Sequence, residues 1–170
     1  MPSKQLRIGL LAVIAFVVLN GVPALALEVW SGRSFQFEKA DFADWTLEPN
    51  QDRITDQVWI TRANTQGIFN IAQEASYSSI SPIDTEWATG DAADYASLTF
   101  QTWVNWTGNS PPSTIGVDAC VHLISEDIYI DIRFESFTGG GGGGFVYVRA
   151  PRPPVAVESA TLSRIKAIFD

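Results

Sequence analysis

Residues 127–137 alternate apolar and polar side chains so regularly that any fold of this chain must contain a sheet with one buried face. A second alternating run, 145–149, follows after six consecutive glycines. The spacing predicts two antiparallel strands joined through the glycines. The apolar side of the first strand is formed by Ile128, Ile130, Ile132 and Phe134.

Shorter runs of strand-forming residues occur along most of the chain, at 33–38, 57–62, 67–72, 95–106 and 117–125. Segments rich in Gly, Pro, Asn and Asp separate them, and we expect the irregular segments 74–93 and 108–113 to be loops. Several short strands with turns between them indicate an all-β fold, an antiparallel β-sandwich or jelly-roll-like domain. We assign this domain to residues 27–150 and expect its loops to carry any site.

The first 26 residues have the pattern of a signal peptide. Two basic residues and no acidic one precede the apolar run 8–19, Asn20 and Pro23 end that run, and Ala24 and Ala26 supply the small residues that signal peptidase needs. We therefore predict an N-terminal signal helix that is cleaved after Ala26, and a protein that is secreted, extracellular or periplasmic. The alternative is a retained membrane anchor, which needs about 20 apolar residues and would have to continue through Pro23.

Residues 151–170 are expected to form a proline-rich spacer followed by a short C-terminal helix. The helix is predicted over 159–169, where Leu162, Ile165 and Phe169 share one face. Two interpretations remain open for it. It is either a lid over an open end of the sheet or a tail that docks onto a partner, and deletion of the tail would then abolish assembly while the domain stays folded.

The acidic balance of the chain excludes two classes of partner. The 170 residues include 19 acidic and 11 basic ones, for a net charge of −8, and removal of residues 1–26 makes the charge about −10. Nucleic acids and anionic membranes bind clustered Lys and Arg. We therefore expect no nucleic acid, and contact with a membrane only transiently through the signal peptide. The single cysteine, Cys120, cannot form a disulfide within the chain, so the core alone must hold the fold.

Two acidic pairs are candidate metal ligands, Asp52 with Asp56 and Glu126 with Asp127. Calcium takes about six to eight oxygen ligands, and loops of a β-domain can supply them. Neither pair has the spacing of an EF-hand. The sequence therefore requires no cofactor, and structural calcium at one of these pairs is the alternative to solvated acidic turns.

The tryptophans are the best candidates for a binding function. The broad apolar face and polar rim of a tryptophan suit it to stacking against a sugar ring. We expect Trp59 and Trp103 on the less apolar faces of their strands, and Trp87 in a loop with Asp84 and Glu86. These five residues form the predicted carbohydrate site, and core packing of the tryptophans is the alternative.

The sequence offers little for catalysis. His122, the only histidine, lies within a predicted strand, and no nucleophile motif of the Gly-x-Ser-x-Gly kind is present. A hydrogen-bonded strand histidine is therefore favoured over a dyad with Cys120, which has no positive field around it. A glycosidase would need two carboxyl groups about 5–10 Å apart in a cleft, and no pair is marked by the sequence.

The glycine run 139–144 is not a phosphate-binding loop, because neither a Lys-Ser/Thr pair nor a helix follows it. It is expected to be a hairpin connection. The alternative is that its bare backbone lets a ligand approach closely.

Four segments together resemble a family of uncharacterised exported bacterial β-domains. These segments are DRITDQVWITR at 52–62, SPIDTEWATG at 81–90, ISEDIYIDIRF at 124–134 and GFVYVR at 144–149. The resemblance covers roughly residues 30–150. It implies a secreted domain of the kind found beside surface-sorting tails, with no established activity and no catalytic residues to carry over. The chain lacks a Pro-Glu-Pro anchor with a hydrophobic helix and basic end, which favours a released or periplasmic product.

Together these features predict a secreted, non-enzymatic binding or structural module with a surface glycan as its ligand. Two alternatives stay open: a secreted glycan hydrolase that uses a carboxylate pair, and a protein-assembly domain that binds an extracellular protein.

Overall fold

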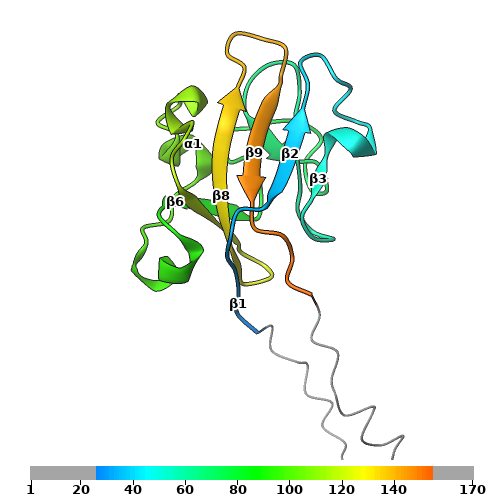
Figure 1. Cartoon of the computed structure of the whole chain (residues 1–170). Coiled ribbons are helices and arrows are strands. Elements are labelled where there is room, and N and C mark those ends of the chain that lie inside the picture. Colours follow the sequence, from blue (N-terminus) through cyan, green and yellow to red (C-terminus); the bar gives the residue numbers. More distant parts are fainter. Residues whose placement is uncertain (1–25, 155–170) are drawn as a thin grey trace, which may run out of the picture.

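The computed structural model describes residues 26–154, and its fold is all-β with a few short helical segments (Figure 1). The strands are β1 (Glu28–Trp30), β2 (Phe35–Lys39), β3 (Asp52–Arg53), β4 (Trp59–Arg62), β5 (Ile68–Asn70), β6 (Thr85–Thr89), β7 (Ala119–Leu123), β8 (Ile128–Phe137) and β9 (Phe145–Arg149). The helix α1 spans Trp103–Trp106, and single 3₁₀ segments span Glu48–Asn50, Ala92–Ser97 and Pro111–Thr114.

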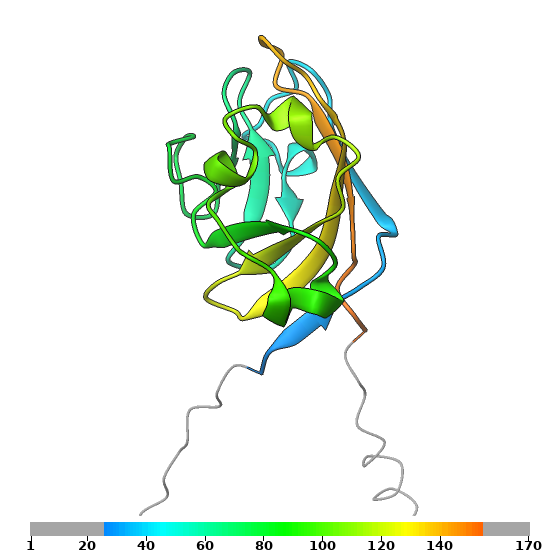
Figure 2. The same cartoon turned by 90° about the vertical axis from the view of Figure 1, so that its left-hand side faces the viewer.

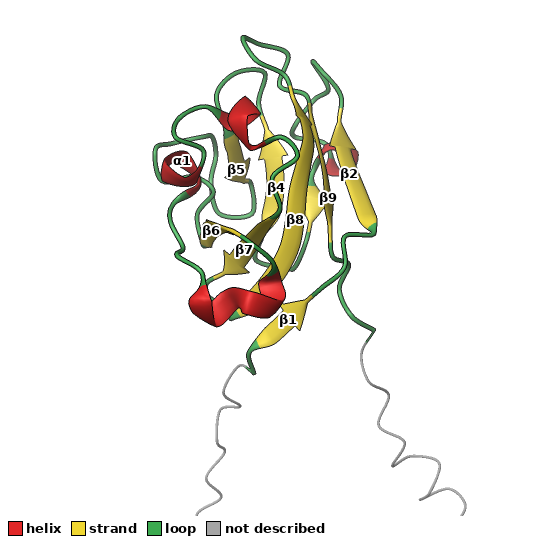
Figure 3. Cartoon of the chain, turned by 60° about the vertical axis from the view of Figure 1, so that its left-hand side comes forward, coloured by secondary structure: helices red, strands yellow, loops and turns green. Residues whose placement is uncertain are grey.

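The strands form two sheets. The larger has the order β2-β9-β8-β7-β6, and the smaller has the order β3-β4-β5. All neighbours in these two orders are antiparallel, whereas β1 pairs with β8 in the parallel direction. Strand β8 is long enough to have two partners along one edge, because β1 pairs with its first residues and β9 with Ile132 onward. Figure 3 shows β8 running the length of the molecule at the centre of the larger sheet.

Side chains of both sheets share one hydrophobic core. The buried side of β8 consists of Ile128, Ile130, Ile132 and Phe134, which confirms the predicted alternation. The smaller sheet adds Ile60 and Ile68. The described residues contain no disulfide, and Cys120 is a free, buried thiol within β7.

Two sequence-based predictions of local structure are wrong. Residues 95–106 do not form a strand, because they contain the end of a 3₁₀ segment and α1, whose buried Trp103 faces the core. Thr102 caps α1 by accepting a hydrogen bond from the Asn105 amide (3.4 Å). The predicted loop 74–93 contains β6, which lies between two residues with positive φ, Asp84 and Gly90. Those turn residues concealed a strand of only five residues.

The alternation at 127–137 puts Asp131 on the polar side of β8, where exposure is expected, and the structure corrects this expectation. Its side chain is buried, because its oxygens accept hydrogen bonds from the backbone amides of Gly32 (2.9 Å) and Ala92 (2.6 Å). The chain segments around β1 and the 3₁₀ segment Ala92–Ser97 cover this part of the sheet. A second layer of backbone therefore hides a strand face that local alternation marks as exposed.

The two ends of the described chain lie at one end of the molecule, and the loop that joins β8 to β9 lies at the opposite end (Figures 1 and 2). Among the described residues, no helix is long and apolar enough to cross a membrane. The predicted signal helix and the predicted C-terminal helix at 159–169 lie outside the described residues.

Candidate functional site

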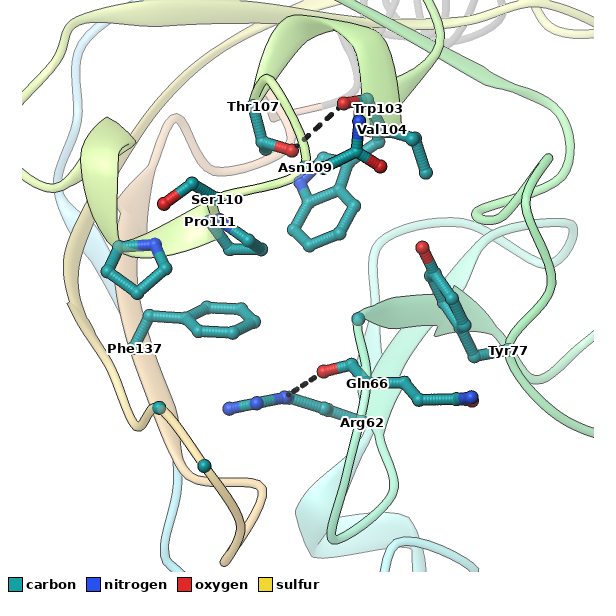
Figure 4. Close-up of a pocket in the computed structure, with 14 residues that line it drawn as sticks. Arg62, Gln66, Tyr77, Trp103, Val104, Thr107, Asn109, Ser110, Pro111 and Phe137 are labelled. Carbon is teal, nitrogen blue, oxygen red and sulfur yellow. Dashed lines mark hydrogen bonds between the residues drawn. The ribbon is translucent and has the colours of Figure 1, made fainter.

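A cavity of about 390 Å³ lies at the end of the molecule that carries the β8–β9 loop. Its walls come from three aromatic side chains and one arginine, and Figure 4 shows these groups arranged around a common space. The aromatic residues are Tyr77, Trp103 and Phe137, and the arginine is Arg62. No aspartate or glutamate is among the described residues that line the cavity.

Arg62 is the last residue of β4 and is only 3% exposed. Its Nε donates to the carbonyl of Gln66 (2.8 Å), and its Nη1 donates to the carbonyl of Gly144 (3.0 Å). The guanidinium carbon lies 3.8 Å from the centre of the Phe137 ring, a cation–π contact. Within residues 26–154 no carboxylate forms an ion pair with Arg62. Burial lowers the pKa of this guanidinium to about 10, although the negative charge of Asp41 acts in the opposite direction. Arg62 is therefore charged at neutral pH.

A second buried cation lies at the same end of the molecule. Lys39, at the end of β2, is 1% exposed, and its Nζ donates to the carbonyls of Ala40 and Gly143 (3.3 Å each). Burial lowers the pKa of Lys39, and the charge of Arg62 lowers it further. Asp41 is nearby, but one of its oxygens already accepts a hydrogen bond from the Gly144 amide (2.8 Å). Two buried basic side chains therefore lie close together in this region, with the charges of Asp41 and Asp44 nearby.

Trp103 and Tyr77 meet above Gly67. A Cβ atom at Gly67 would lie 2.5 Å from Cζ3 of Trp103 and 2.5 Å from Cε2 of Tyr77, so only glycine lets both rings sit there. The buried indole N–H of Trp103 has no hydrogen-bond partner among the described residues. Leaving such a donor unpaired costs about 1–3 kcal/mol.

Tyr77 is carried by a loop that Glu74 holds in place. One Glu74 oxygen accepts hydrogen bonds from the backbone amides of Asn70 and Ile83 (2.8 Å each), and the other bonds the hydroxyl of Ser81. A single carboxylate thus ties both ends of the loop together. Partial burial raises the pKa of the Tyr77 hydroxyl, which therefore stays protonated at neutral pH.

The glycine loop divides into two parts with different surroundings. Gly142, Gly143 and Gly144 are buried, and a Cβ atom at any of them would collide with Asp41 or with the backbone of Ala63. Gly139 and Gly140 are exposed, line the cavity, and have nothing within 4 Å of an added Cβ atom. The loop is therefore both a packed connection and, at the cavity, a stretch of bare backbone.

Of the three predicted tryptophans, only Trp103 reaches this cavity. Trp59 is half-buried, its indole N–H donates to the Thr55 carbonyl (2.9 Å), and the Arg53 guanidinium lies 4.2 Å from its ring centre. Trp87 lies in β6 rather than in a loop and is 1% exposed. Its ring stacks on that of Trp106, with 5.7 Å between the centres. Trp87 therefore presents no free face, and Arg53 covers part of the ring of Trp59.

The predicted acidic partners of the tryptophans lie elsewhere. Asp84 accepts hydrogen bonds from the amide (2.9 Å) and the hydroxyl (2.5 Å) of Ser125. Glu86 lies 2.8 Å from Nδ1 of His122, and Asp127 lies 3.3 Å from Nε2 of the same ring. His122 also stacks on Tyr129, with 4.1 Å between ring centres. His122 is thus a strand histidine with polar partners, as expected.

The two members of each candidate calcium pair have different surroundings. Asp52 is buried and bonds Arg149 with both oxygens, whereas Asp56 is exposed. Glu126 accepts a hydrogen bond from the Thr55 hydroxyl (2.5 Å), whereas Asp127 lies beside His122. No group of three or more His, Cys, Asp or Glu side chains within residues 26–154 could hold a metal ion. Structural calcium stays a prediction.

Nothing in the sequence marks Arg62, Tyr77 and Phe137 as site residues, because they belong to different segments and no motif surrounds any of them. The only local indication was Gly139 and Gly140, whose bare backbone was considered as a ligand contact. Comparison with family models, with curated proteins and with solved structures found no match to this chain.

Proposed function

We propose that this protein is an exported, non-enzymatic module that binds a glycan in the cavity formed by Trp103, Tyr77 and Phe137. The observation that carries the proposal is the grouping of these three rings with a buried arginine around one space of about 390 Å³. Small-molecule sites usually have volumes of about 300–1,000 Å³, mostly apolar walls and a few polar groups.

The chemistry of the walls suits a sugar. The C–H faces of a pyranose ring pack on aromatic rings. Half-buried Tyr77 is the ring with surface open to such packing, because Trp103 and Phe137 are only 2% and 7% exposed. The hydroxyl groups of the sugar need polar partners at the rim. Asn109 and Ser110 at the cavity supply an amide and a hydroxyl, and Arg62 supplies N–H donors. The exposed Gly139 and Gly140 leave room for a chain that extends beyond one sugar.

A binding role is favoured over hydrolysis. A glycosidase needs two carboxyl groups on either side of the glycosidic bond. The described residues that line the cavity include no carboxylate, and one pair of acids, Glu86 and Asp127, lies beside His122 at a different site. A glycan hydrolase or a protein-assembly domain is therefore the second choice.

We further propose that the two sheets are the layers of a β-sandwich with jelly-roll-like character, which their common core supports. Export through a signal peptide at residues 1–26 places the mature module outside the cytoplasm, as a secreted, extracellular or periplasmic protein. A surface glycan is its proposed partner.

The test is binding of the mature protein, residues 27–170, to a glycan array, with calcium and again with a chelator. Tyr77→Ala is expected to weaken binding about tenfold or more, since half-buried Tyr77 forms one wall of the cavity. The matched control is Tyr95→Ala, a half-buried tyrosine outside the cavity that contacts Tyr129. Folded protein that binds no glycan would overturn the proposal, and a difference between the two buffers would reveal bound calcium.

A further inference from the structure

We infer that the glycan is an anionic one, with a carboxylate or a sulfate group, and that Arg62 binds this acid group. This inference rests on the proposed function, because it names the kind of sugar that the same cavity takes.

The Arg62 guanidinium has N–H donors that no described residue uses. A guanidinium has five N–H donors, and here Nε and Nη1 each bond one backbone carbonyl. Among the described residues, Nη2 has no hydrogen-bond partner, and Arg62 lines the cavity. The cation–π contact with Phe137 holds the plane of the group, so its free donors have a fixed direction (Figure 4). A ligand that accepts hydrogen bonds from these donors binds a guanidinium that does not have to reorganise.

The second argument is charge. Arg62 and Lys39 are both almost fully buried, and neither forms an ion pair within residues 26–154. A buried cation is costly unless an anion or several dipoles compensate it. The backbone carbonyls of Gln66, Gly143 and Gly144 compensate in part, and so does the nearby charge of Asp41. An acid group on the ligand would complete this compensation, and hydrogen bonds between charged groups are the strong ones.

The third argument is access. The exposed rim at Gly139 and Gly140 has no side chain that would keep a bulky acid group away from Arg62. Gly139 does not have a positive φ, and nothing lies within 4 Å of an added Cβ atom. Neither backbone conformation nor packing therefore requires glycine at position 139, whereas Gly142–144 are all required by packing. The absence of a side chain at Gly139 leaves room for a ligand at the rim of the cavity.

The experiment compares three probes by titration calorimetry with the mature protein. They are an oligogalacturonate, the neutral oligosaccharide made from it by carboxyl reduction, and a sulfated galactose oligosaccharide of similar length. We expect the oligogalacturonate to bind about tenfold or more tighter than its reduced form, with an affinity that falls as salt is raised. Tighter binding of the sulfated probe than of the oligogalacturonate would support an anionic ligand and identify a sulfate as its acid group.

The outcomes distinguish failure of this inference from failure of the proposed glycan-binding function. Equal binding of the oligogalacturonate, the sulfated oligosaccharide and the reduced oligosaccharide would overturn the inference and leave the glycan-binding function intact. Binding of none of these probes, by folded protein that also binds nothing on the array, would overturn both.

Two variants at the rim test the charge without disturbing the core. Gly139→Asp places a negative charge beside the cavity, and Gly139→Asn is the matched neutral control of nearly the same size. Both side chains enter open space, so both variants should fold. We expect the aspartate variant to bind the oligogalacturonate about tenfold more weakly than the asparagine variant, and the two to bind the reduced form equally. Equal binding of the acid by both variants would overturn the inference.

A third variant addresses Arg62 directly. Arg62→Gln is expected to abolish the preference for the acidic probe while binding of the neutral probe survives. Because Arg62 also supports the loop through Gly144, circular dichroism must first show that this variant is folded. If Arg62→Gln is not folded, the two Gly139 variants test the inference.

Discussion

Arg149 and Asp52 form a buried ion pair with two hydrogen bonds that joins the larger sheet to the smaller one. Nε of Arg149 lies 2.7 Å from one oxygen of Asp52, and Nη2 lies 2.7 Å from the other. Arg149 ends β9 and Asp52 begins β3. The hydroxyl of Tyr147 also donates to Asp52 (2.6 Å), so this carboxylate is the polar centre of the contact between the sheets.

Asp52→Ala is expected to destabilise the protein by about 3–5 kcal/mol, because it leaves the buried charge of Arg149 without its partner. Urea unfolding measures the effect. The control is Glu48→Ala, which breaks the exposed ion pair with Arg53 (3.1 Å) and should cost about 0–1 kcal/mol. Similar losses in both variants would contradict this account.

Gly67→Ala is expected to cost about 1–3 kcal/mol and to abolish glycan binding, because the new methyl group must push apart Trp103 and Tyr77. Gly139→Ala is the matched control for stability alone, since its methyl group meets open space and should change stability by less than about 0.5 kcal/mol. Thermal unfolding and calorimetry give the two readouts. Full binding by the Gly67 variant would show that these rings do not form the site.

Glu74→Gln is expected to weaken binding by loosening the loop that carries Tyr77. The amide keeps only one acceptor oxygen where the carboxylate has two, so at least one of the hydrogen bonds to Asn70, Ile83 or Ser81 is lost, at about 1–3 kcal/mol. Faster amide exchange of Ile83 would report the loosening. Exposed Asp56→Asn removes the same charge without such bonds and should match the wild type.

Cys120 is expected to resist alkylation by iodoacetamide at pH 8 until the protein unfolds. Burial raises the pKa of its thiol from 9.0 to about 12, so the thiolate fraction falls about a thousandfold, and the side chain is also inaccessible. Labelling with and without urea, followed by mass spectrometry, measures this. Rapid labelling of native protein would show that β7 opens readily or that the thiol is exposed.

The same thiol should make stability depend on alkaline pH. Because the folded pKa is raised, its stabilising contribution is complete below about pH 9 and is lost as pH rises toward 12. Between pH 8 and pH 10 the advantage of the wild type over Cys120→Ala should shrink by about 1.4 kcal/mol. Urea titrations of both proteins at the two pH values measure it, and a constant difference would contradict the burial of the thiol.

Much of the sheet could be predicted because strand alternation is a local property. The segments that became β8 and β9 carry their pattern within ten residues or fewer, and Ile130 and Phe134 are buried as that pattern requires. Prediction failed where tertiary contacts outweigh local preference. Residues 95–106 are rich in strand formers, yet burial of Trp103 and the cap at Thr102 produce a helical turn.

The sequence alone therefore establishes an all-β chain with a central hairpin, because backbone pairing follows from alternation and from turn residues. The cavity depends on the tertiary structure, which brings Arg62, Tyr77, Trp103 and Phe137 together from four separate segments. Burial decides the rest. An arginine at the end of a strand is ordinary in a sequence, and it becomes a candidate anion receptor only when the fold removes it from water without giving it a carboxylate.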